Sequence, residues 1–188
     1  MKRILTVFLS LVVGISIHAQ EKIKPVEGEL FFGATFPLSA FQDGNKGVGP
    51  LIGGEIRYNF KESPFDIGIS LGMTTAMYDF TLQDYSTKET KEYSQSNRTA
   101  YIALSSNYNF KQGEKINPYA GIGIGLASND VLGDVLYENN EGGSTVIIPR
   151  IGIEFVRHFR ITLSSTISKK GYHNMSLGIG FVFGGGKK

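Results

Sequence analysis

Alternation of apolar and polar residues at a period of two constrains this 188-residue chain more than any other feature of its sequence. Residues 65–71, for example, read FDIGISL, in which every large apolar residue is followed by a small or polar one. Successive side chains of a β-strand point to opposite faces, so this period predicts strands that are apolar on one face only. Eight such strands are expected, at residues 29–37, 51–60, 65–78, 98–110, 118–128, 145–156, 159–168 and 175–183.

The connections between these segments indicate where the strands lie. Long connections at residues 38–50, 79–97 and 129–144 alternate with short ones at 61–64, 111–117 and 157–158. Outer-membrane barrels have short periplasmic turns and long outer loops, and a tilted strand needs roughly 9 to 11 residues to cross the bilayer. Because an open strand edge in hydrocarbon would leave amide groups unpaired, the sheet must close. The predicted fold class is all-β, an eight-stranded antiparallel up-and-down transmembrane β-barrel over residues 29–183. A soluble periplasmic β-barrel binder is the alternative.

Aromatic residues gather at the strand ends next to the short connections. Rings of this kind are favoured at the membrane–water interface, so the pattern predicts an aromatic girdle on the periplasmic side. Two strand ends share one pattern, since residues 57–61 read RYNFK and residues 107–111 read NYNFK. The expected girdle comprises Tyr58, Phe60, Phe65, Tyr108, Phe110, Phe155, Phe159, Phe181 and Phe183.

The N-terminus has the composition of an export signal. Residues 1–3 carry positive charge, residues 4–17 are an apolar run too short to span a bilayer as a helix, and small and polar residues follow. We expect a signal peptide at residues 1–19, a short segment at 20–28 and a C-terminal tail at 184–188. The chain has no cysteine, which excludes disulfides, thiolate metal sites and attachment of lipid through an N-terminal thiol.

The polar face of the predicted strands would line the lumen. Eight strands enclose a space just wide enough to be filled by side chains, and the alternate glycines leave room for a few long charged ones. Buried charges must be paired, so a structural salt-bridge network is expected, with conduction or a ligand path as the functional alternative. Its predicted members are Glu29, Glu55, Arg57, Asp66, Arg150, Glu154 and Arg160.

The sequence offers little that indicates catalysis. Glycine-rich strings such as residues 121–125 lie in a strand and do not open a helix, and no histidine pair has metal-ligand spacing. His173 and Ser176 could form a nucleophilic pair, but their opposite parity in a strand would point them to opposite faces. We therefore expect no enzymatic activity, no catalytic or metal residues and no cofactor. The net charge of +2 is small and both signs are scattered, so no nucleic-acid partner is expected either.

The closing segment carries a family resemblance. Residues 176–183 read SLGIGFVF, which together with the YNFK strand ends and the HAQ at residues 18–20 resembles small outer-membrane barrels of the OmpA and OmpX type. The resemblance is closer still to the outer-membrane β-barrel proteins of Bacteroidetes-like bacteria. It implies that the barrel-insertion machinery recognises the last strand through Ser176, Gly178, Phe181 and Phe183. The chain departs from the commonest pattern because residues 184–188 follow the final phenylalanine.

The role expected from these features is non-enzymatic. The leading hypothesis is an exported bacterial outer-membrane barrel with a plugged polar lumen, which has a structural or surface-interaction role through its long outer loops. The alternatives are a narrow channel or small-ligand carrier, and a lipid-modifying enzyme. The expected partners are outer-membrane lipid and lipopolysaccharide, the insertion machinery during assembly, and a surface partner at loops 38–50, 79–97 and 129–144.

Overall fold

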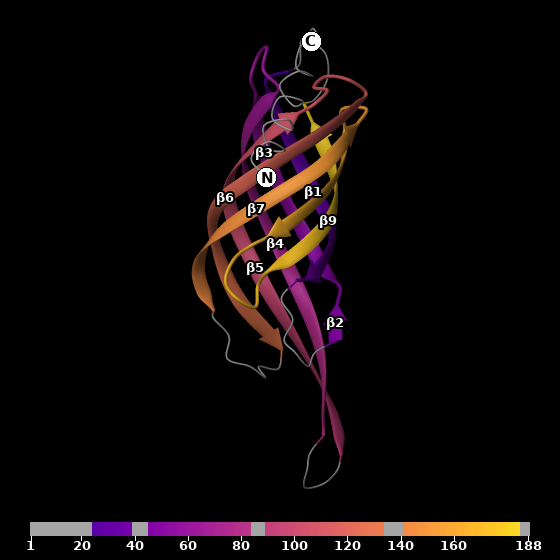
Figure 1. Cartoon of the computed structure of the whole chain (residues 1–188), viewed down its shortest axis with the longest axis vertical. Helices are drawn as coiled ribbons and strands as arrows, with labels where there is room; N and C mark the ends of the chain where they lie inside the picture. The colour runs from indigo at the N-terminus through magenta and orange to yellow at the C-terminus, as the bar shows by residue number, and fades with distance from the viewer. Residues whose placement is uncertain (1–23, 39–44, 84–88, 134–140, 185–188) are drawn as a thin grey trace, which may run out of the picture.

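A single closed sheet dominates the structure, a computed structural model that describes residues 24–38, 45–83, 89–133 and 141–184 (Figure 1). The predicted signal peptide, residues 20–23 and residues 185–188 lie outside the described residues. The strands are β1 (Val26–Pro37), β2 (Asn45–Gly47), β3 (Gly49–Asn59), β4 (Phe65–Gln83), β5 (Thr90–Asn109), β6 (Ile116–Gly133), β7 (Gly142–Phe155), β8 (Phe159–Thr166) and β9 (Asn174–Phe183). The described residues contain no helix long and apolar enough to span a membrane.

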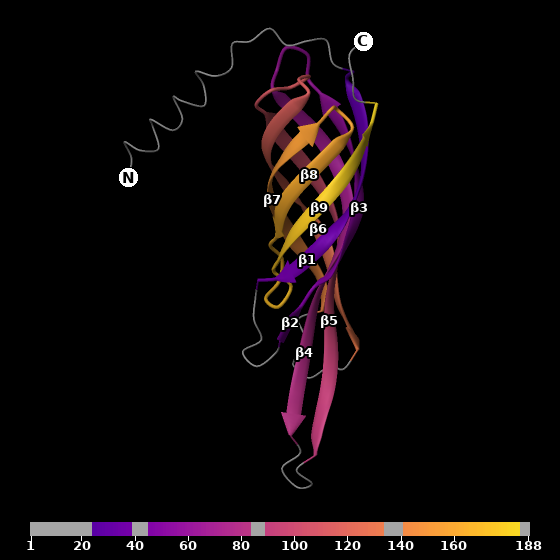
Figure 2. The same cartoon turned by 90° about the vertical axis from the view of Figure 1, so that its right-hand side faces the viewer.

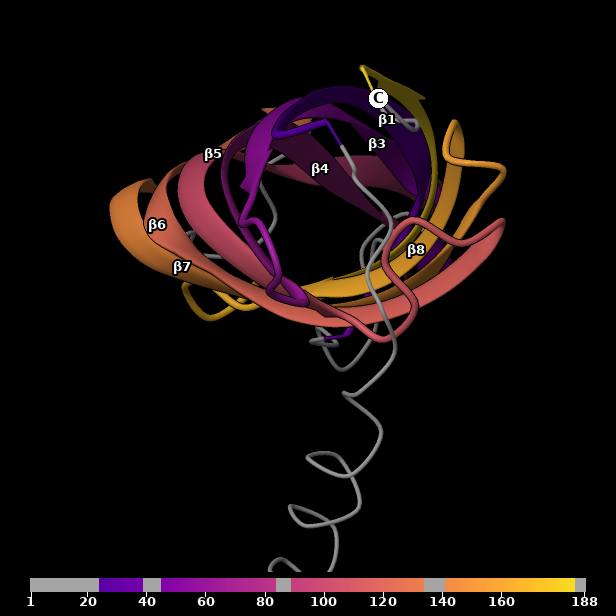
Figure 3. The same cartoon turned by 90° about the horizontal axis from the view of Figure 1, so that it is seen from above.

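Eight of the strands form an up-and-down antiparallel ring, as predicted. Each pairs with the next along the chain, and β9 returns to pair with β1 from Gly28↔Phe183 to Pro37↔Asn174. Viewed along its axis the sheet surrounds a lumen (Figure 3). The short β2 stands outside the ring and pairs with β4 over Asn45↔Asp79 to Gly47↔Met77.

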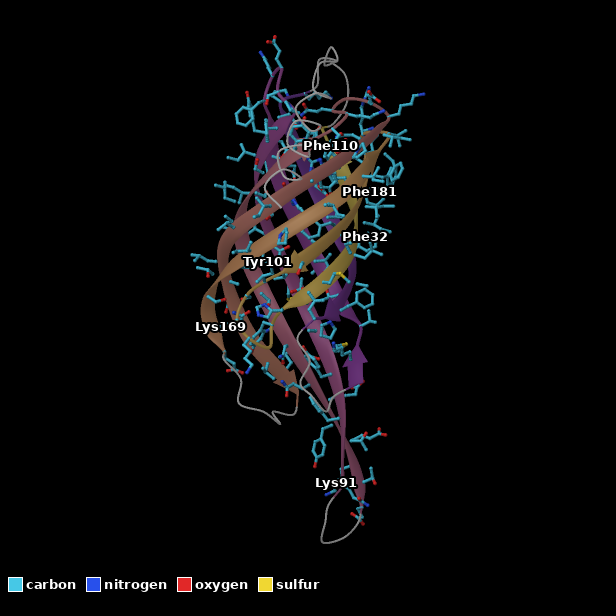
Figure 4. The ribbon with its side chains drawn as sticks, viewed as in Figure 1. Phe32, Lys91, Tyr101, Phe110, Lys169 and Phe181 are labelled. Carbon is cyan, nitrogen blue, oxygen red and sulfur yellow. The ribbon has the colours of Figure 1, made fainter. Side chains whose placement is uncertain are left out.

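The alternation sorts side chains to the two faces of the wall. Leu30, Leu104 and Ile124 point outward and keep more than half of their surface exposed, whereas Ala103 and Val146 point inward and are buried. A continuous apolar exterior is stable only against lipid. Phe110 and Phe181 lie near the end where the short turns gather, and Lys91 and Lys169 lie toward the opposite end (Figure 4). The rings of the expected girdle contact one another, as in the edge-to-face pairs Tyr58–Phe60 and Tyr108–Phe110.

The ranges predicted as long loops are partly strand, which corrects the prediction. β4 runs on to Gln83 and β5 starts at Thr90, so most of the predicted loop 79–97 is a β-hairpin. β2 lies inside the predicted loop 38–50, and β6 and β7 extend into 129–144. Beyond Met77 the apolar residues of β4 change face: Tyr78 and Phe80 are buried on the inner side, whereas Asp79 and Thr81 are exposed. The lipid-facing alternation therefore ends while backbone pairing continues, here to Gln83↔Thr90. The hairpin therefore projects well past the rest of the ring (Figure 2).

Candidate functional site: the filled lumen

Glycines on the inner face make room for the large polar side chains of neighbouring strands. Gly180 is paired with Arg160, and a Cβ atom at Gly180 would lie 2.1 Å from Oε1 of Glu29. The Tyr101 ring lies over its cross-strand partner Gly72, where a Cβ atom would lie 2.4 Å from the phenol oxygen. The alternate glycines of the sequence thus leave space that charged and aromatic side chains of neighbouring strands occupy.

Arg57 is the centre of a buried ion cluster in the half of the lumen nearest the short turns. Its Nε donates to Oε2 of Glu27 at 2.8 Å, and its Nη1 donates to Oε2 of Glu29 at 2.6 Å. Both carboxylates come from the adjacent strand β1, while Glu154 reaches Arg57 Nη2 at 3.5 Å from β7, four strands away in the ring of eight. The side chain of Arg57 is fully buried, so its charge depends on these partners.

Arg160 extends the same cluster on the other side. Its Nε donates to Oε2 of Glu154 at 2.7 Å, and its Nη1 lies 3.6 Å from Oε2 of Glu29. The guanidinium carbon also lies 4.3 Å from the centre of the Tyr119 ring, a cation–π distance. Glu29 and Glu154 therefore each join two arginines, which links β1, β3, β7 and β8 through one network.

A second ion pair crosses the whole barrel. Arg150 on β7 donates from Nη1 and Nη2 to the two carboxylate oxygens of Glu55 on β3, at 2.5 and 2.8 Å. These strands lie on opposite sides of the ring. Ser105 donates to Glu55 at 3.0 Å, and Arg150 Nε donates to Asn107 at 2.8 Å. This bidentate pair therefore spans the lumen from one wall to the opposite one.

Of the seven charged residues predicted for the lumen, six form these ion pairs. Asp66 is the exception, because its carboxylate accepts hydrogen bonds from the side-chain amides of Asn107 and Asn109 at 2.7 and 2.8 Å. Sequence reasoning missed Glu27, which fell in the segment assigned to residues 20–28. Glu27 has the same parity as Glu29, and this signal could have found it. The assigned role, a structural network, stays a prediction that the geometry makes testable.

An apolar layer follows the charged residues along the lumen. Ala103, Ala127, Val146 and Ile148 form a buried cluster, with Tyr101 packed against it. Between this cluster and the Glu55–Arg150 pair lies a cavity of about 40 Å³, which is space for a few water molecules. A continuous aqueous path would have to cross both the ion pairs and this apolar constriction.

The outer half of the lumen is filled by neutral polar side chains and an inturned loop. Asn97 on β5 donates to the carbonyl of Gly171 at 2.8 Å, and Asn174 donates to Oγ1 of Thr74 at 3.0 Å. The loop at residues 167–173 thereby turns toward the strands on the other side of the ring. Tyr172 is buried, and this burial, with Glu141 and Asp130 as further causes, raises its pKa to about 12. The phenol therefore stays neutral, like the amides around it.

His173 and Ser176, the catalytic candidates, do not bond to each other. Nδ1 of His173 accepts from the backbone amide of Ser168 at 3.2 Å, and the Ser176 hydroxyl shares a 3.0 Å hydrogen bond with Thr35. Among the described residues no group of three histidine, cysteine, aspartate or glutamate residues could hold a metal ion. The expectation of no enzymatic activity is not tested by this geometry.

The residues assigned to the insertion signal divide between the two faces of β9. Ser176 and Gly178 face inward, while Phe181 and Phe183 face the lipid side with 43% and 55% of their surface exposed. Phe181 packs on Phe159 with ring centres 4.8 Å apart. Their recognition by the insertion machinery stays a prediction.

Sequence comparison gives one family. The family model described as the outer membrane protein beta-barrel domain matches residues 7–184. No curated protein matches the chain in sequence.

Several solved structures are similar to the chain at low identity. Ail, the attachment invasion locus protein of Yersinia pestis, in complex with the heparin analogue sucrose octasulfate, is 13% identical at a TM-score of 0.44, covering 86% of this chain and 99% of Ail. Neisserial surface protein A is 12% identical at a TM-score of 0.48, covering 87% and 99%. The N-terminal β-barrel domain of Pseudomonas aeruginosa OprF is 19% identical at a TM-score of 0.39, covering 87% and 100%.

Proposed function

The chain belongs to the outer membrane protein beta-barrel domain family, and we propose that it acts there as a closed, non-enzymatic barrel that presents a surface-interaction hairpin. It is a small barrel protein of the bacterial outer membrane, with its short turns on the periplasmic side and its long connections outside. The more specific resemblance to barrels of Bacteroidetes-like bacteria, the export by residues 1–19 and the extent of the barrel domain remain predictions.

The projecting hairpin is the observation that carries the proposal. From Phe80 to Gln83 and from Thr90 to Ser94, β4 and β5 pair only with each other. This ribbon adds nothing to the wall of the ring, and it carries Lys91 far from the rest of the barrel (Figure 4). A strand pair with free edges and mixed charges is suited to contact with another protein, by strand addition or through its side chains.

The filled lumen supports the second part of the proposal. Two ion-pair groups, an apolar layer and the inturned loop follow one another along the axis. Purified protein in planar bilayers should show no steady ohmic conductance. A steady pore would contradict the closed barrel and favour the narrow channel. The variants Arg57→Ala and Arg150→Ala provide a second test. A change in conductance or solute uptake that exceeds the change in heat stability would also favour the narrow channel.

Site-specific photo-crosslinking tests the surface role. A photoreactive residue in place of Lys91, on the hairpin, is compared with one in place of Ile124, which faces lipid with 59% of its surface exposed. A discrete protein adduct in whole cells is expected from position 91 and not from position 124. Absence of any protein adduct from position 91 would overturn the surface-interaction role and leave a structural one.

A further inference from the structure

The repeated strand end at residues 57–61 and 107–111 builds the same arrangement twice at the periplasmic rim. In both copies the tyrosine and phenylalanine point outward and form an edge-to-face pair, with ring centres 5.5 Å apart in the first and 5.0 Å apart in the second. In both copies the intervening asparagine points into the lumen and is buried. The closing lysine then stands just beyond the rings and is exposed.

Hydrogen bonds of the buried asparagines connect the two turns to each other. Gln112, in the turn that follows Phe110, donates to Oδ1 of Asn59 at 3.2 Å. Asn109 accepts from Asn117 at 3.0 Å, and the side-chain oxygen of Asn117 accepts from the amide of Lys111 at 3.0 Å. The backbones that carry Lys61 and Lys111 are thus held in fixed positions next to one another.

A third turn brings a further cation to this rim. Residues 156–158 connect β7 and β8, and Val156 and Arg157 both have positive φ, at 45° and 64°, as the central residues of a type I′ turn require. The amide of His158 donates to the carbonyl of Phe155 at 3.1 Å and closes the turn. Nε of Arg157 donates to the carbonyl of Gly113 at 2.8 Å, and the amide of Val156 donates to the carbonyl of Lys115 at 2.7 Å. Arg157 therefore lies against the turn that carries Lys111 and Lys115.

These turns carry an excess of positive charge at a defined depth. Residues 60–64, 110–115 and 156–157 include four cationic side chains, Lys61, Lys111, Lys115 and Arg157, and only two anionic ones, Glu62 and Glu114. Lys111 Nζ lies 3.5 Å from Oε2 of Glu114, and both side chains are 57% exposed, so Glu114 neutralises little of the positive charge of Lys111. Because the aromatic rings fix the membrane interface, the ammonium groups lie at the level of the lipid phosphates.

We infer that this rim is a binding site for anionic phospholipid of the periplasmic leaflet, with Lys61, Lys111 and Lys115 contacting the headgroup phosphate and the paired rings contacting the upper acyl chain. A ligand that fits this site carries both an anionic group and a hydrocarbon chain, because the cationic surface and the aromatic surface adjoin. A lysine near a membrane surface contributes about 1 kcal/mol to such binding, a factor of about five.

The test uses the refolded barrel in phosphatidylcholine vesicles with a minor fraction of spin-labelled phosphatidylglycerol or phosphatidylcholine. The relative association of the two labelled lipids is measured for the unchanged protein, for the rim variant K61Q/K111Q/K115Q, and for the control variant K46Q/K91Q/K170Q. The control removes three exposed lysines from the outer end of the molecule. Heat-shifted gel migration in phosphatidylcholine verifies that all three proteins are folded.

The unchanged protein and the control should prefer phosphatidylglycerol at least about threefold, and the rim variant should bring the ratio close to one. The absence of a preference in the unchanged protein would overturn the site, and so would a preference retained by the rim variant. Competition by inorganic phosphate, beyond that of chloride at equal ionic strength, would identify a site for free phosphate and overturn the lipid assignment.

Discussion

The two halves of the lumen are filled by different chemistry. The periplasmic half holds Arg57, Arg150 and Arg160 with five carboxylates, four of which are held in ion pairs. The described side chains that fill the outer half are neutral, such as Asn97, Asn129, Asn174 and Tyr172. Both halves are tightly buried, so burial alone does not explain the difference.

The contrast shows two ways of satisfying buried polar groups. A guanidinium has five donors and can join several strands at once, but its removal leaves carboxylates without a partner. Amides and hydroxyls join in pairs, as in Thr99–Asn129 and Ser144–Ser168, and each bond contributes about 1 kcal/mol. The periplasmic half should therefore depend on single residues, whereas the outer half should tolerate the loss of any one.

The largest effect is expected from Arg57→Ala. The substitution leaves Glu27 and Glu29 without their shortest charged contacts, and loss of one partner of a buried ion pair typically costs about 3–5 kcal/mol, so we expect a loss of that size in the free energy of unfolding. Urea unfolding in detergent, followed by the heat-shifted band, measures it. A loss below about 1 kcal/mol would remove the distinction between the two halves.

Gly180→Ala should have the next largest effect. The added methyl group would lie 2.1 Å from Oε1 of Glu29 and displace a carboxylate that joins Arg57 and Arg160. Overpacking of this kind costs about 1–3 kcal/mol. Gly28→Ala is the matched control, since a Cβ atom there meets nothing within 4 Å. Equal stability of the two variants in the same unfolding assay would refute the idea that the glycine serves as space for the ion cluster.

Asn97→Ala tests the neutral half. The carbonyl of Gly171 loses its side-chain donor, and Gln95 loses the acceptor that it reaches at 2.8 Å. We expect a loss of about 2 kcal/mol, because two neutral hydrogen bonds are lost and each contributes about 1 kcal/mol. The exposed Thr145→Ala serves as the reference. A loss as large as that of Arg57→Ala would show that the inturned loop, and not the ion cluster, dominates stability.

The smallest effect is expected from Arg98→Ala. Arg98 pairs with Asp130 through two hydrogen bonds, but the two side chains are 36% and 39% exposed on the outer face of the wall. Exposed ion pairs contribute about 0–1 kcal/mol. The same unfolding assay should therefore detect little change. A cost comparable to that of Arg57→Ala would mean that ion pairing itself, rather than burial in the lumen, sets the energy scale.

Much of the barrel could be predicted from the sequence because a membrane constrains local pattern strongly. Where a strand crosses lipid, one face must be apolar, so the parity of Glu55, Arg57 and Arg150 is sufficient to place these residues in the lumen. The same reasoning failed beyond the membrane, where the apolar residues of β4 change to the inner face at Tyr78 and Phe80 and no longer continue the lipid-facing pattern. It also failed at Glu27, because the first strand was predicted to start only at residue 29, although Val26 already faces outward with 55% of its surface exposed.

The sequence by itself determined the strands, their two faces, the closed ring of eight and the identity of most lumenal charges, because each follows from the period of two and the need to pair every amide in lipid. Only the tertiary structure decided which charges meet. The Glu55–Arg150 pair joins residues 95 positions apart, and ring closure places their strands on opposite sides of one narrow lumen. The inward turn of residues 167–173 was likewise decided there, because Asn97, which donates to the carbonyl of Gly171, comes from β5 on the other side of the ring.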